Sequence, residues 1–361
     1  MSITDIVFNL LLFSFAIQIV YVVCVSSRIT FHKDEIKKSN IGISIIICAR
    51  NELSNLKQFL PEILNQNHQE FEVIVVNDRS WDDSLIFLNE MKKKITHLKV
   101  VNIGDNGTDH FGKKLAITLG IKAAKYENLI FTDADCYPSS ENWLNEMSGG
   151  FTNEKEIVLG ASTYQKEKGF LNRIIRFDTA QIAVNYMGFA KSKIPYMGIG
   201  RNLGYTRKTY ENARGFKSHY HIESGDDDLF INENSNRKNT AIVFGENNIT
   251  VSIPKKTFKN WIRQKKRHHT TNSHYKLLHK ILLTAVYIST LTYYSSIFSL
   301  LISCSFTNFV IGIFMIRTLV FIALYYKPFK ILLCKDLLIA LPVYEIILLI
   351  SLPIIQLFRS K

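Results

Sequence analysis

Four long apolar segments set the first limit on how this chain can fold. They are Ile6 to Val25 and Ile281 to Phe306, which contain no charged residue, Thr307 to Tyr326, which contains only Arg317, and Leu337 to Phe358, which contains only Glu345. A run of about 20 apolar residues is long enough to cross the hydrocarbon core of a bilayer as a helix. The sequence therefore predicts one membrane helix near the start of the chain and three near its end.

The first and the last segment each leave an alternative open. The first is either a membrane anchor or a signal peptide, and we favour the anchor because no basic region precedes a run that is long for a signal peptide. The last contains Pro342, Pro353 and Glu345, so it is either a kinked span or a re-entrant hairpin.

Lysine and arginine residues gather beside the predicted spans. Residues 254–280 contain nine of them and no Asp or Glu, and others follow the first span or separate the third from the fourth (Arg28, Lys33, Lys37, Lys38, Lys327, Lys330 and Lys335). Because cytoplasmic flanks are rich in Lys and Arg, the pattern predicts a multi-pass protein of the cell (inner, cytoplasmic) membrane with its central domain in the cytoplasm. The side of the C-terminus stays open, since Arg359 and Lys361 oppose an external position.

The formal net charge of +13 raises the question of nucleic-acid binding. The excess lies beside the spans, where it would meet the anionic headgroups of membrane lipids. No helix-turn-helix, zinc-finger or aromatic RNA-binding pattern is present, so we expect no nucleic-acid partner. The five cysteines form no C-x-x-C pair, which disfavours a disulfide framework and a thiolate zinc site.

Between the spans, apolar β-branched runs alternate with helical patterns. The runs are 43–48, 71–76, 100–103 and 129–131, and the helical patterns are 53–65, 84–91 and 113–125. This alternation predicts an α/β domain with a parallel sheet covered by helices. Polar clusters follow the first, second and fourth runs, which predicts a nucleotide-sized cleft at that edge. No dinucleotide fingerprint and no P-loop is present.

The segment LIFTDADC, residues 129–136, ends a predicted buried strand with two carboxylates. Asp133 and Asp135 are separated only by Ala134, so they can share one hard divalent cation. Mg²⁺ is commonly held by one or two carboxylates together with substrate phosphates. The pattern favours a metal–diphosphate site, and the alternative is an ordinary turn after a strand, since Pro138, Ser139 and Ser140 follow.

These motifs, with others downstream, resemble the family 2 glycosyltransferases over about residues 42–268. They are ICARNE (47–52), VVNDRS (75–80), GKKLAI (112–117), TDADC (132–136), GIGRNLGYTRKTY (198–210), ESGDDDLFIN (223–232) and QKKRH (264–268). The resemblance implies an inverting enzyme with a GT-A fold, that is, a Rossmann-like, mixed and mainly parallel sheet flanked by helices. Among membrane-bound members, the chain is similar to poly-N-acetylglucosamine and hyaluronan synthases and to ceramide glucosyltransferases.

The same resemblance divides the chain into four parts. We expect an N-terminal transmembrane helix over 1–27, a linker over 28–41, a cytoplasmic GT-A domain over 42–270 and a C-terminal membrane region with about three helices over 271–361. The segment 170–189 is amphipathic and aromatic, and it is either an interfacial helix on the bilayer or a core helix.

On the donor side, the resemblance assigns roles to residues of several motifs. Asp78 would contact uracil or ribose, Ala49, Arg50 and Glu52 would form the nucleotide floor, and Lys113 would contact the donor, unless it is a solvated helix lysine. Asp133 and Asp135 would hold Mg²⁺ or Mn²⁺, with Asp135 as the more direct ligand. Gln264 and Arg267 share one helix face and would bind the diphosphate, although Arg263 to Arg267 also reads as a basic membrane-surface helix.

The general base would come from Asp226, Asp227 and Asp228, whose like charges should raise at least one pKa. The register of the hyaluronan-type motif selects Asp227, and a register matched on the following leucine selects Asp226; we predict Asp227. His268 stands where the family has a Trp that lines the acceptor channel of processive members, which puts processivity in doubt.

The resulting hypothesis is a membrane-bound inverting glycosyltransferase. It would transfer a sugar from a UDP-sugar to a lipid-linked, glycolipid or growing polysaccharide acceptor. The alternatives are a processive polysaccharide synthase with secretion, a non-catalytic membrane scaffold and a sugar nucleotidyltransferase. No motif points to a particular donor sugar, linkage or partner subunit.

Overall fold

The computed structural model describes residues 2–33, 40–104 and 112–357. The chain forms two compact units, one made of Met1–His32, Lys166–Ser192 and Lys256–Lys361 and the other of Lys33–Gln165 and Lys193–Lys255. We call them the membrane-helix unit and the sheet unit. Four residues that were used to predict the orientation lie outside the described residues: Lys37, Lys38, Arg359 and Lys361. Residues 34–39, in the middle of the predicted linker, also lie outside them.

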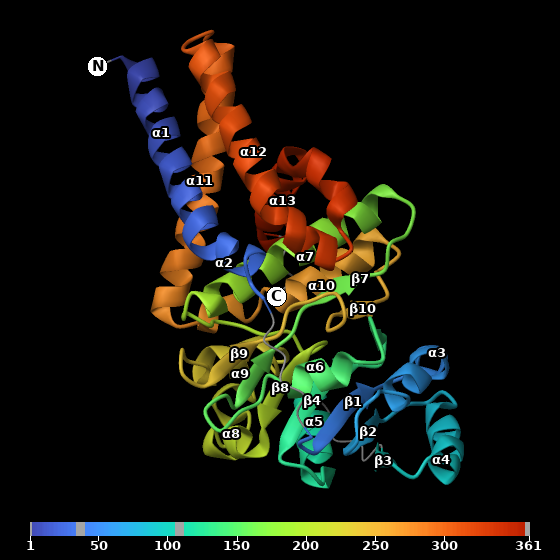
Figure 1. Ribbon diagram of the computed structural model, residues 1–361. Coiled ribbons are helices and arrows are strands. Elements are labelled where there is room, and N and C mark those ends of the chain that lie inside the picture. The colour runs from blue at the N-terminus through green and yellow to red at the C-terminus, as the bar shows by residue number, and fades with distance from the viewer. Residues whose placement is uncertain (1, 34–39, 105–111, 358–361) are drawn as a thin grey trace. The chain divides into compact units, whose positions relative to one another are not determined.

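A seven-stranded sheet forms the centre of the sheet unit (Figure 1). Its strands, in spatial order, are β3 (Leu98–Ile103), β2 (Phe71–Asp78), β1 (Ile43–Ala49), β4 (Asn128–Asp133), β8 (Leu203–Thr206), β6 (Ile157–Leu159) and β9 (Thr240–Ile242). The first four strands are parallel, β8 runs antiparallel to β4 and β6, and β9 runs parallel to β6. The predicted mixed, mainly parallel sheet is confirmed.

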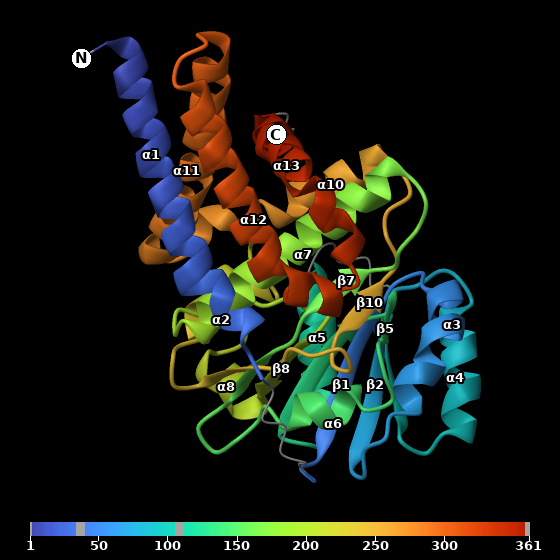
Figure 2. The same cartoon turned by 45° about the horizontal axis from the view of Figure 1, so that its top comes forward.

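Helices cover both faces of this sheet (Figure 2). On one face, Ile43, Ile45 and Ile47 of β1 pack in one cluster with residues of α3 (Leu53–Leu64), α4 (Ser84–Lys94) and α6 (Trp143–Ser148). On the other face, α5 (Gly112–Ala123) packs against β1 and β2. Gly120 allows this close approach, because a Cβ atom there would lie 2.7 Å from Cγ2 of Ile46.

Smaller elements complete the sheet unit. A three-stranded sheet has the order β5 (Cys136–Pro138), β10 (Thr250–Ser252) and β7 (Ser162–Tyr164). The remaining helices are α8 (Arg207–Asn212), the 3₁₀ turn η2 (Lys217–His219) and α9 (Asp228–Asn234). Only two residues separate the end of β4 from the start of β5, so the small sheet holds the far end of the turn that contains Asp135.

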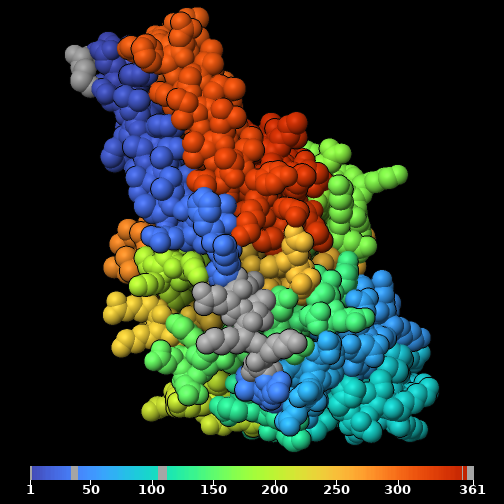
Figure 3. All heavy atoms as spheres, viewed as in Figure 1, coloured from blue at the N-terminus to red at the C-terminus, as the bar shows by residue number. Residues whose placement is uncertain are grey.

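Within the residues that the structure describes, the membrane-helix unit contains four helical segments that are long and apolar enough to cross a membrane. They comprise α1 (Ile3–Tyr21) continued by η1 (Val22–Ser26) and α2 (Ser27–Thr30), then α11 (Leu277–Ile302), α12 (Thr307–Ile331), and η4 (Lys335–Ala340) with α13 (Leu341–Leu357). α1 packs along α11, which also packs on α12, and the space-filling view shows the side chains of α1 and α12 in contact (Figure 3). The chain is therefore a membrane protein by the length and composition of its helices.

Three more helices belong to this unit: α7 (Phe170–Lys191), α10 (Phe258–His268) and the 3₁₀ turn η3 (Asn272–His274). α7 is largely buried and packs against η1, α2, α12 and α13. A Cβ atom at Gly188 would lie 2.8 Å from the carbonyl oxygen of Val25, so the glycine permits this packing. Asp178 of α7 also forms an ion pair with Lys265 of α10. α7 is thus a core element of the unit, which is one of the two alternatives that the sequence left open.

Candidate functional site

A cleft lies on the α5 face of the sheet, at the carboxyl ends of β1 and β4. Its lining combines the ends of these strands with the first turn of α5 and two loop segments, and it includes Cys48, Lys113, Thr132, Gly200, Tyr205, Asp226 and Asp227. Residues far apart in the chain therefore meet at the edge of the sheet where the sequence predicted a ligand site.

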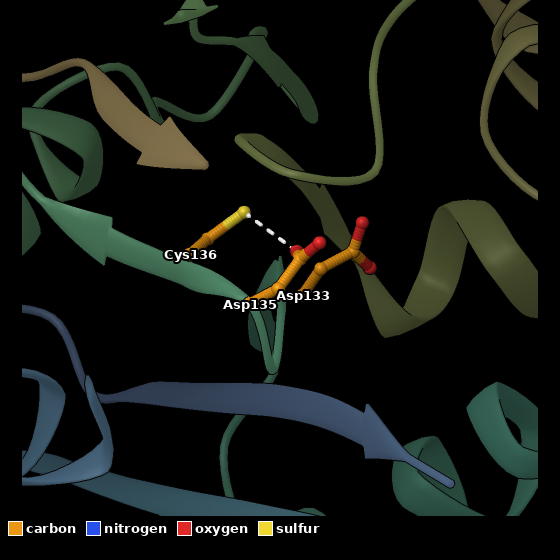
Figure 4. Close-up of side chains that lie close together, drawn as sticks. All are labelled: Asp133, Asp135 and Cys136. Carbon is orange, nitrogen blue, oxygen red and sulfur yellow. Dashed lines mark hydrogen bonds between the residues drawn. The ribbon is translucent and has the colours of Figure 1, made fainter. Parts of the chain in front are cut away.

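The two acids of the DADC segment lie at the exit of β4. Asp133 is the last residue of β4, Asp135 lies in the following turn and Cys136 begins β5. One ligand atom of each of these three residues lies within 4.8 Å of the others, and Figure 4 shows the two carboxylates close together with the Cys136 side chain directed at Asp135. Strand geometry alone would point Asp133 and Asp135 to the same side, and the turn brings their carboxylates into one cluster.

The chemistry of this cluster fits a hard divalent cation. Burial raises the pKa of the Cys136 thiol well above its ordinary value, so this residue stays protonated and donates a hydrogen bond of 3.4 Å to Oδ1 of Asp135. Only the thiolate is a strong metal ligand, so the available donors are the carboxylate oxygens of Asp133 and Asp135. Carboxylate oxygens are the ligands that Mg²⁺ and Mn²⁺ prefer.

The electrostatics of the cluster also fit a bound divalent cation. Burial and the neighbouring Asp133 both raise the pKa of Asp135, while Arg201 and Lys255 oppose the rise. The pKa of Glu52 is raised as well, first by burial and then by the charges of Asp135 and Asp133. Three carboxylates thus share one electrostatic environment, in which a cation would favour the charged forms.

Lys113 connects this cluster with the downstream acidic motif. Its Nζ lies 2.5 Å from Oδ1 of Asp133 and 3.6 Å from Oδ2 of Asp226. Burial by itself lowers the pKa of Lys113, but the charges of Asp133 and Asp226 outweigh it and raise the pKa well above its usual value. Lys113 is therefore a charged residue in contact with two acids, not a solvated helix lysine.

The three consecutive aspartates occupy different environments. Asp226 faces Lys113, and Asp228 begins α9 with only 9% of its surface exposed and accepts a hydrogen bond of 2.8 Å from the Leu229 amide. Asp227 lines the cleft and accepts hydrogen bonds from two backbone amides, those of Gly200 and Asp228, both at 2.7 Å. Burial, followed by the charges of Asp226 and Asp228, raises the pKa of Asp227 to about 7.

The residues predicted to form the nucleotide floor lie at the carboxyl ends of β1 and β2. Asp78 ends β2, is nearly buried and lies 2.8 Å from Nε of Arg79. Ala49 ends β1 and is buried, and the guanidinium of Arg50 lies over the ring of Trp81 at 5.7 Å. The loops after the two strands are tied together, since the Asn51 amide donates to Oγ of Ser80 at 2.9 Å.

Gln264 and Arg267 lie on α10, which belongs to the membrane-helix unit, as does His268 at the end of that helix. The neighbouring Lys265 forms an ion pair with Asp178. The roles proposed for Gln264 and Arg267 stay predictions.

Sequence reasoning gave no role to three residues that act on the acids of the site or on the loop before them. Gly200 orients Asp227, Arg201 acts electrostatically on Asp135, and Nζ of Lys114 donates to the carbonyl oxygens of His219 and Ile222 at 2.5 and 2.7 Å. The motifs GIGRNLGYT and GKKLAI contain all three, so the signal was present. What the pattern lacked was the direction in which each side chain points.

A sheet of this topology, with paired acids at the exit of β4, defines the GT-A class of nucleotide-sugar transferases. The mannosyltransferase PcManGT from Pyrobaculum calidifontis, solved with GDP-Man and Mn²⁺, has this fold: it matches with a TM-score of 0.62 over 100% of both chains at 16% identity. Residues 44–215 also match the family model described as Glycosyl transferase family 2. The chain therefore contains a family 2 glycosyltransferase domain.

Curated relatives match parts of the chain. A poly(ribitol-phosphate) beta-glucosyltransferase from Bacillus spizizenii is 28% identical over 190 residues, 52% of this chain and 28% of that protein. A poly-beta-1,6-N-acetyl-D-glucosamine synthase from Staphylococcus epidermidis is 34% identical over 94 residues, 26% of this chain and 22% of that protein. A 4,4'-diaponeurosporenoate glycosyltransferase from Staphylococcus haemolyticus is 31% identical over 127 residues, 35% and 33% respectively. The matched stretch spans at most 33% of these three relatives.

Proposed function

We propose that this chain is an inverting enzyme that transfers a sugar from a UDP-sugar to a lipid-linked, glycolipid or growing polysaccharide acceptor. One observation carries the proposal: Lys113, which lines the cleft, contacts both Asp133 and Asp226, so one side chain connects an acid proposed for the donor side with an acid of the proposed base motif. Departure of the diphosphate and attack by the acceptor hydroxyl take place at the same sugar carbon. Both steps therefore need charged groups within a few ångströms of that carbon.

On the donor side, the proposed binding residues lie along the carboxyl edge of the sheet. Asp78 receives the uracil or ribose, and Ala49, Arg50 and Glu52 support the nucleotide. Asp133 and Asp135 hold Mg²⁺ or Mn²⁺, with Asp135 as the more direct ligand, and a bound ion supplies positive charge to the departing diphosphate. Lys113 adds a further positive charge at the same place, and Gln264 and Arg267 are proposed as additional diphosphate contacts.

On the acceptor side, Asp227 is the proposed base. It removes the proton from the acceptor hydroxyl, the hydroxyl oxygen attacks the anomeric carbon, and the bond to the diphosphate oxygen breaks on the opposite face. The configuration is therefore inverted, the proton ends on Asp227 and the electron pair leaves with the diphosphate. A pKa of about 7 supports this role, because a base works best when its pKa lies near the working pH.

The apolar helices support an acceptor that lies in or at the membrane. Four helical segments are long enough to span a bilayer, and the Lys and Arg residues beside them support a cytoplasmic position for the catalytic domain. A lipid-linked acceptor would then reach the enzyme by diffusion in the plane of the bilayer. The presence of His268 in place of the family's Trp favours a lipid or short acceptor over a long polymer.

A processive polysaccharide synthase is the second candidate. The similarity to a poly-beta-1,6-N-acetyl-D-glucosamine synthase, 34% identity over 94 residues, favours it. The two candidates share the donor chemistry and differ in whether the product stays bound for another addition.

A single incubation tests these functions. Membranes containing the wild-type chain or the Asp227→Asn variant are given a panel of radiolabelled UDP-sugars with Mn²⁺ or Mg²⁺. We expect wild-type membranes to release UDP and to label material that extracts into organic solvent, while the variant binds UDP but transfers nothing. Label retained in a high-mass polymer would instead identify the processive synthase. Pyrophosphate formed from UTP and a sugar 1-phosphate in a parallel incubation would indicate a nucleotidyltransferase, and the absence of UDP release, label and pyrophosphate would indicate a non-catalytic scaffold.

A further inference from the structure

Arg201 presents a cationic side chain with one unsatisfied hydrogen-bond donor in the described part of the chain. Its Nη1 atom is buried and has no partner there. Its charge acts on both acids of the metal cluster, Asp135 and Asp133. A buried charged donor without an acceptor is costly, so its persistence in a folded protein calls for a ligand or a function.

The position of Arg201 is fixed by its surroundings. Its guanidinium lies over the ring of Tyr164 in β7, 4.5 Å from the ring centre, and its carbonyl oxygen accepts a hydrogen bond of 3.0 Å from Oγ1 of Thr250. The next residue, Asn202, is fully buried and donates to the carbonyl oxygens of Ala161 and Asn248 at 2.7 and 2.8 Å. The backbone is therefore held in place before any substrate binds, and little ordering is needed on binding.

The same short segment also orients the proposed base. Gly200, the residue before Arg201, donates its amide to Asp227, and a Cβ atom at Gly200 would lie 3.4 Å from Nζ of Lys113. Consecutive residues thus serve the acceptor side through the Gly200 backbone and the metal side through the Arg201 side chain.

We propose that Arg201 binds the diphosphate of the donor and stabilises the negative charge that develops on it as the sugar departs. The guanidinium offers paired donors in one plane, which match phosphate oxygens better than a single ammonium does. The guanidinium lies over the Tyr164 ring, and its buried Nη1 donor has no acceptor in the described part of the chain, so this donor can still bind a phosphate oxygen. This inference rests on the proposed sugar transfer from a nucleoside diphosphate.

Three measurements on the full-length protein in detergent test the role. The Arg201→Met and Arg201→Lys variants are compared with wild type for the Kd of UDP in the presence of Mn²⁺, for the Kd of Mn²⁺ without nucleotide, and for kcat and KM of the donor. The loss of a charge-assisted hydrogen bond predicts a weakening of UDP binding by roughly 10- to 100-fold in Arg201→Met and a smaller one in Arg201→Lys. Mn²⁺ alone should bind as tightly or more tightly, because a positive charge near Asp135 is removed.

If Arg201 binds the diphosphate, Arg201→Met weakens UDP binding but does not weaken Mn²⁺ binding. The loss of a purely structural residue would weaken both. Arg237→Met serves as the control, since Arg237 is an exposed arginine of the same unit, and it should match wild type in every measurement. The inference is overturned if Arg201→Met keeps the wild-type Kd of UDP and kcat, or if UDP affinity, Mn²⁺ affinity and Tm all fall together. A wild-type protein that neither binds UDP nor releases it from UDP-sugars would overturn the proposed function itself, and with it the inference.

Discussion

The backbone amide of Gly200 donates a hydrogen bond of 2.7 Å to Oδ2 of Asp227. With the Asp228 amide on the other oxygen, two main-chain donors hold the Asp227 carboxylate in a fixed orientation. These bonds favour the charged carboxylate, whereas burial and the charges of Asp226 and Asp228 favour the acid, and the balance places the pKa of Asp227 at about 7. The residue is therefore oriented by the backbone and has its proton affinity set by its acidic neighbours.

This balance predicts how transfer depends on pH. A base acts only when deprotonated, so kcat/KM should rise with pH and level off above about 7, the folded-state pKa of Asp227. The Asp226→Asn substitution removes a negative charge that raises this pKa, so the rise should move to lower pH. A pH–rate profile of both proteins checks the shift. An Asp226→Asn profile that is unchanged, or moved to higher pH, would contradict the assignment of Asp227 as the base.

The metal prediction concerns Asp135. Asp135→Ala removes one of the two carboxylates at the exit of β4, so we expect Mn²⁺ affinity and transfer to fall by at least about 100-fold, in line with the loss of a ligand or its support. Isothermal titration calorimetry measures the Mn²⁺ affinity, and a donor assay measures transfer. Chelation of the ion should abolish transfer by the wild-type enzyme, and adding the ion back should restore it.

Asp83→Asn is a matched control for this variant, because Asp83 is an exposed carboxylate of the same unit. It should retain both properties. Wild-type transfer by Asp135→Ala, or activity that survives chelation, would show that the reaction needs no ion at these acids.

Lys114 should act on the base motif through the loop that precedes it. Its side chain is 1% exposed and donates to the carbonyl oxygens of His219 and Ile222, just before Asp226 and Asp227. Lys114→Met removes the Lys114 donor from both carbonyls and leaves the His219 carbonyl only the Ile222 amide, which should destabilise the unit by about 1–3 kcal/mol and lower kcat more than it weakens UDP binding.

The matched control for Lys114→Met is Lys122→Met, which removes an exposed lysine from the same helix. Thermal unfolding together with donor kinetics distinguishes the two variants. Equal effects of the two substitutions, or a fall in UDP affinity without a fall in kcat, would contradict a positioning role for Lys114.

The sequence was most informative where strands are long and buried. The runs at 43–48, 71–76 and 129–131 correspond to β1, β2 and β4, because strands covered on both faces need continuous apolar residues. The short strands β8, β6 and β9 have three or four residues each and carry no such signal. Their pairing depends on the long connections between them, which no local pattern encodes.

In the candidate site, too, the sequence predicted some features and not others. The acids at 133, 135 and 226–228 stand out as residue types, and the parallel sheet predicts that the first two lie at its carboxyl edge. Asp226 is distinguished by its contact with Lys113 and Asp227 by the Gly200 amide, and both of these partners come from other elements. Arg201 was overlooked for a related reason: its significance lies in an unpaired atom, which a sequence does not show.

The last prediction concerns a buried ion pair among the apolar helices. Nη1 and Nη2 of Arg317 in α12 lie 2.7 and 3.1 Å from the two carboxylate oxygens of Glu345 in α13. Gln18 of α1 accepts from Nε of Arg317, and the Tyr294 hydroxyl of α11 donates to Glu345 at 2.6 Å. Each of the four candidate spans thus contributes one member of a single polar network, which explains why otherwise apolar segments retain two charges.

Removing one partner should therefore cost more than removing both. Arg317→Met or Glu345→Leu leaves an uncompensated buried charge and should destabilise the helices by about 3–5 kcal/mol, whereas the double variant should recover much of the loss. Unfolding in detergent micelles, followed as a double-mutant cycle, measures the coupling between the two residues. Lys280→Met, at a half-buried position near the start of α11 and outside this network, should change stability little. If the two single effects simply add, the pair does not hold the helices together, and their packing must depend on apolar contacts such as that of Leu11 with Leu300 and Val310.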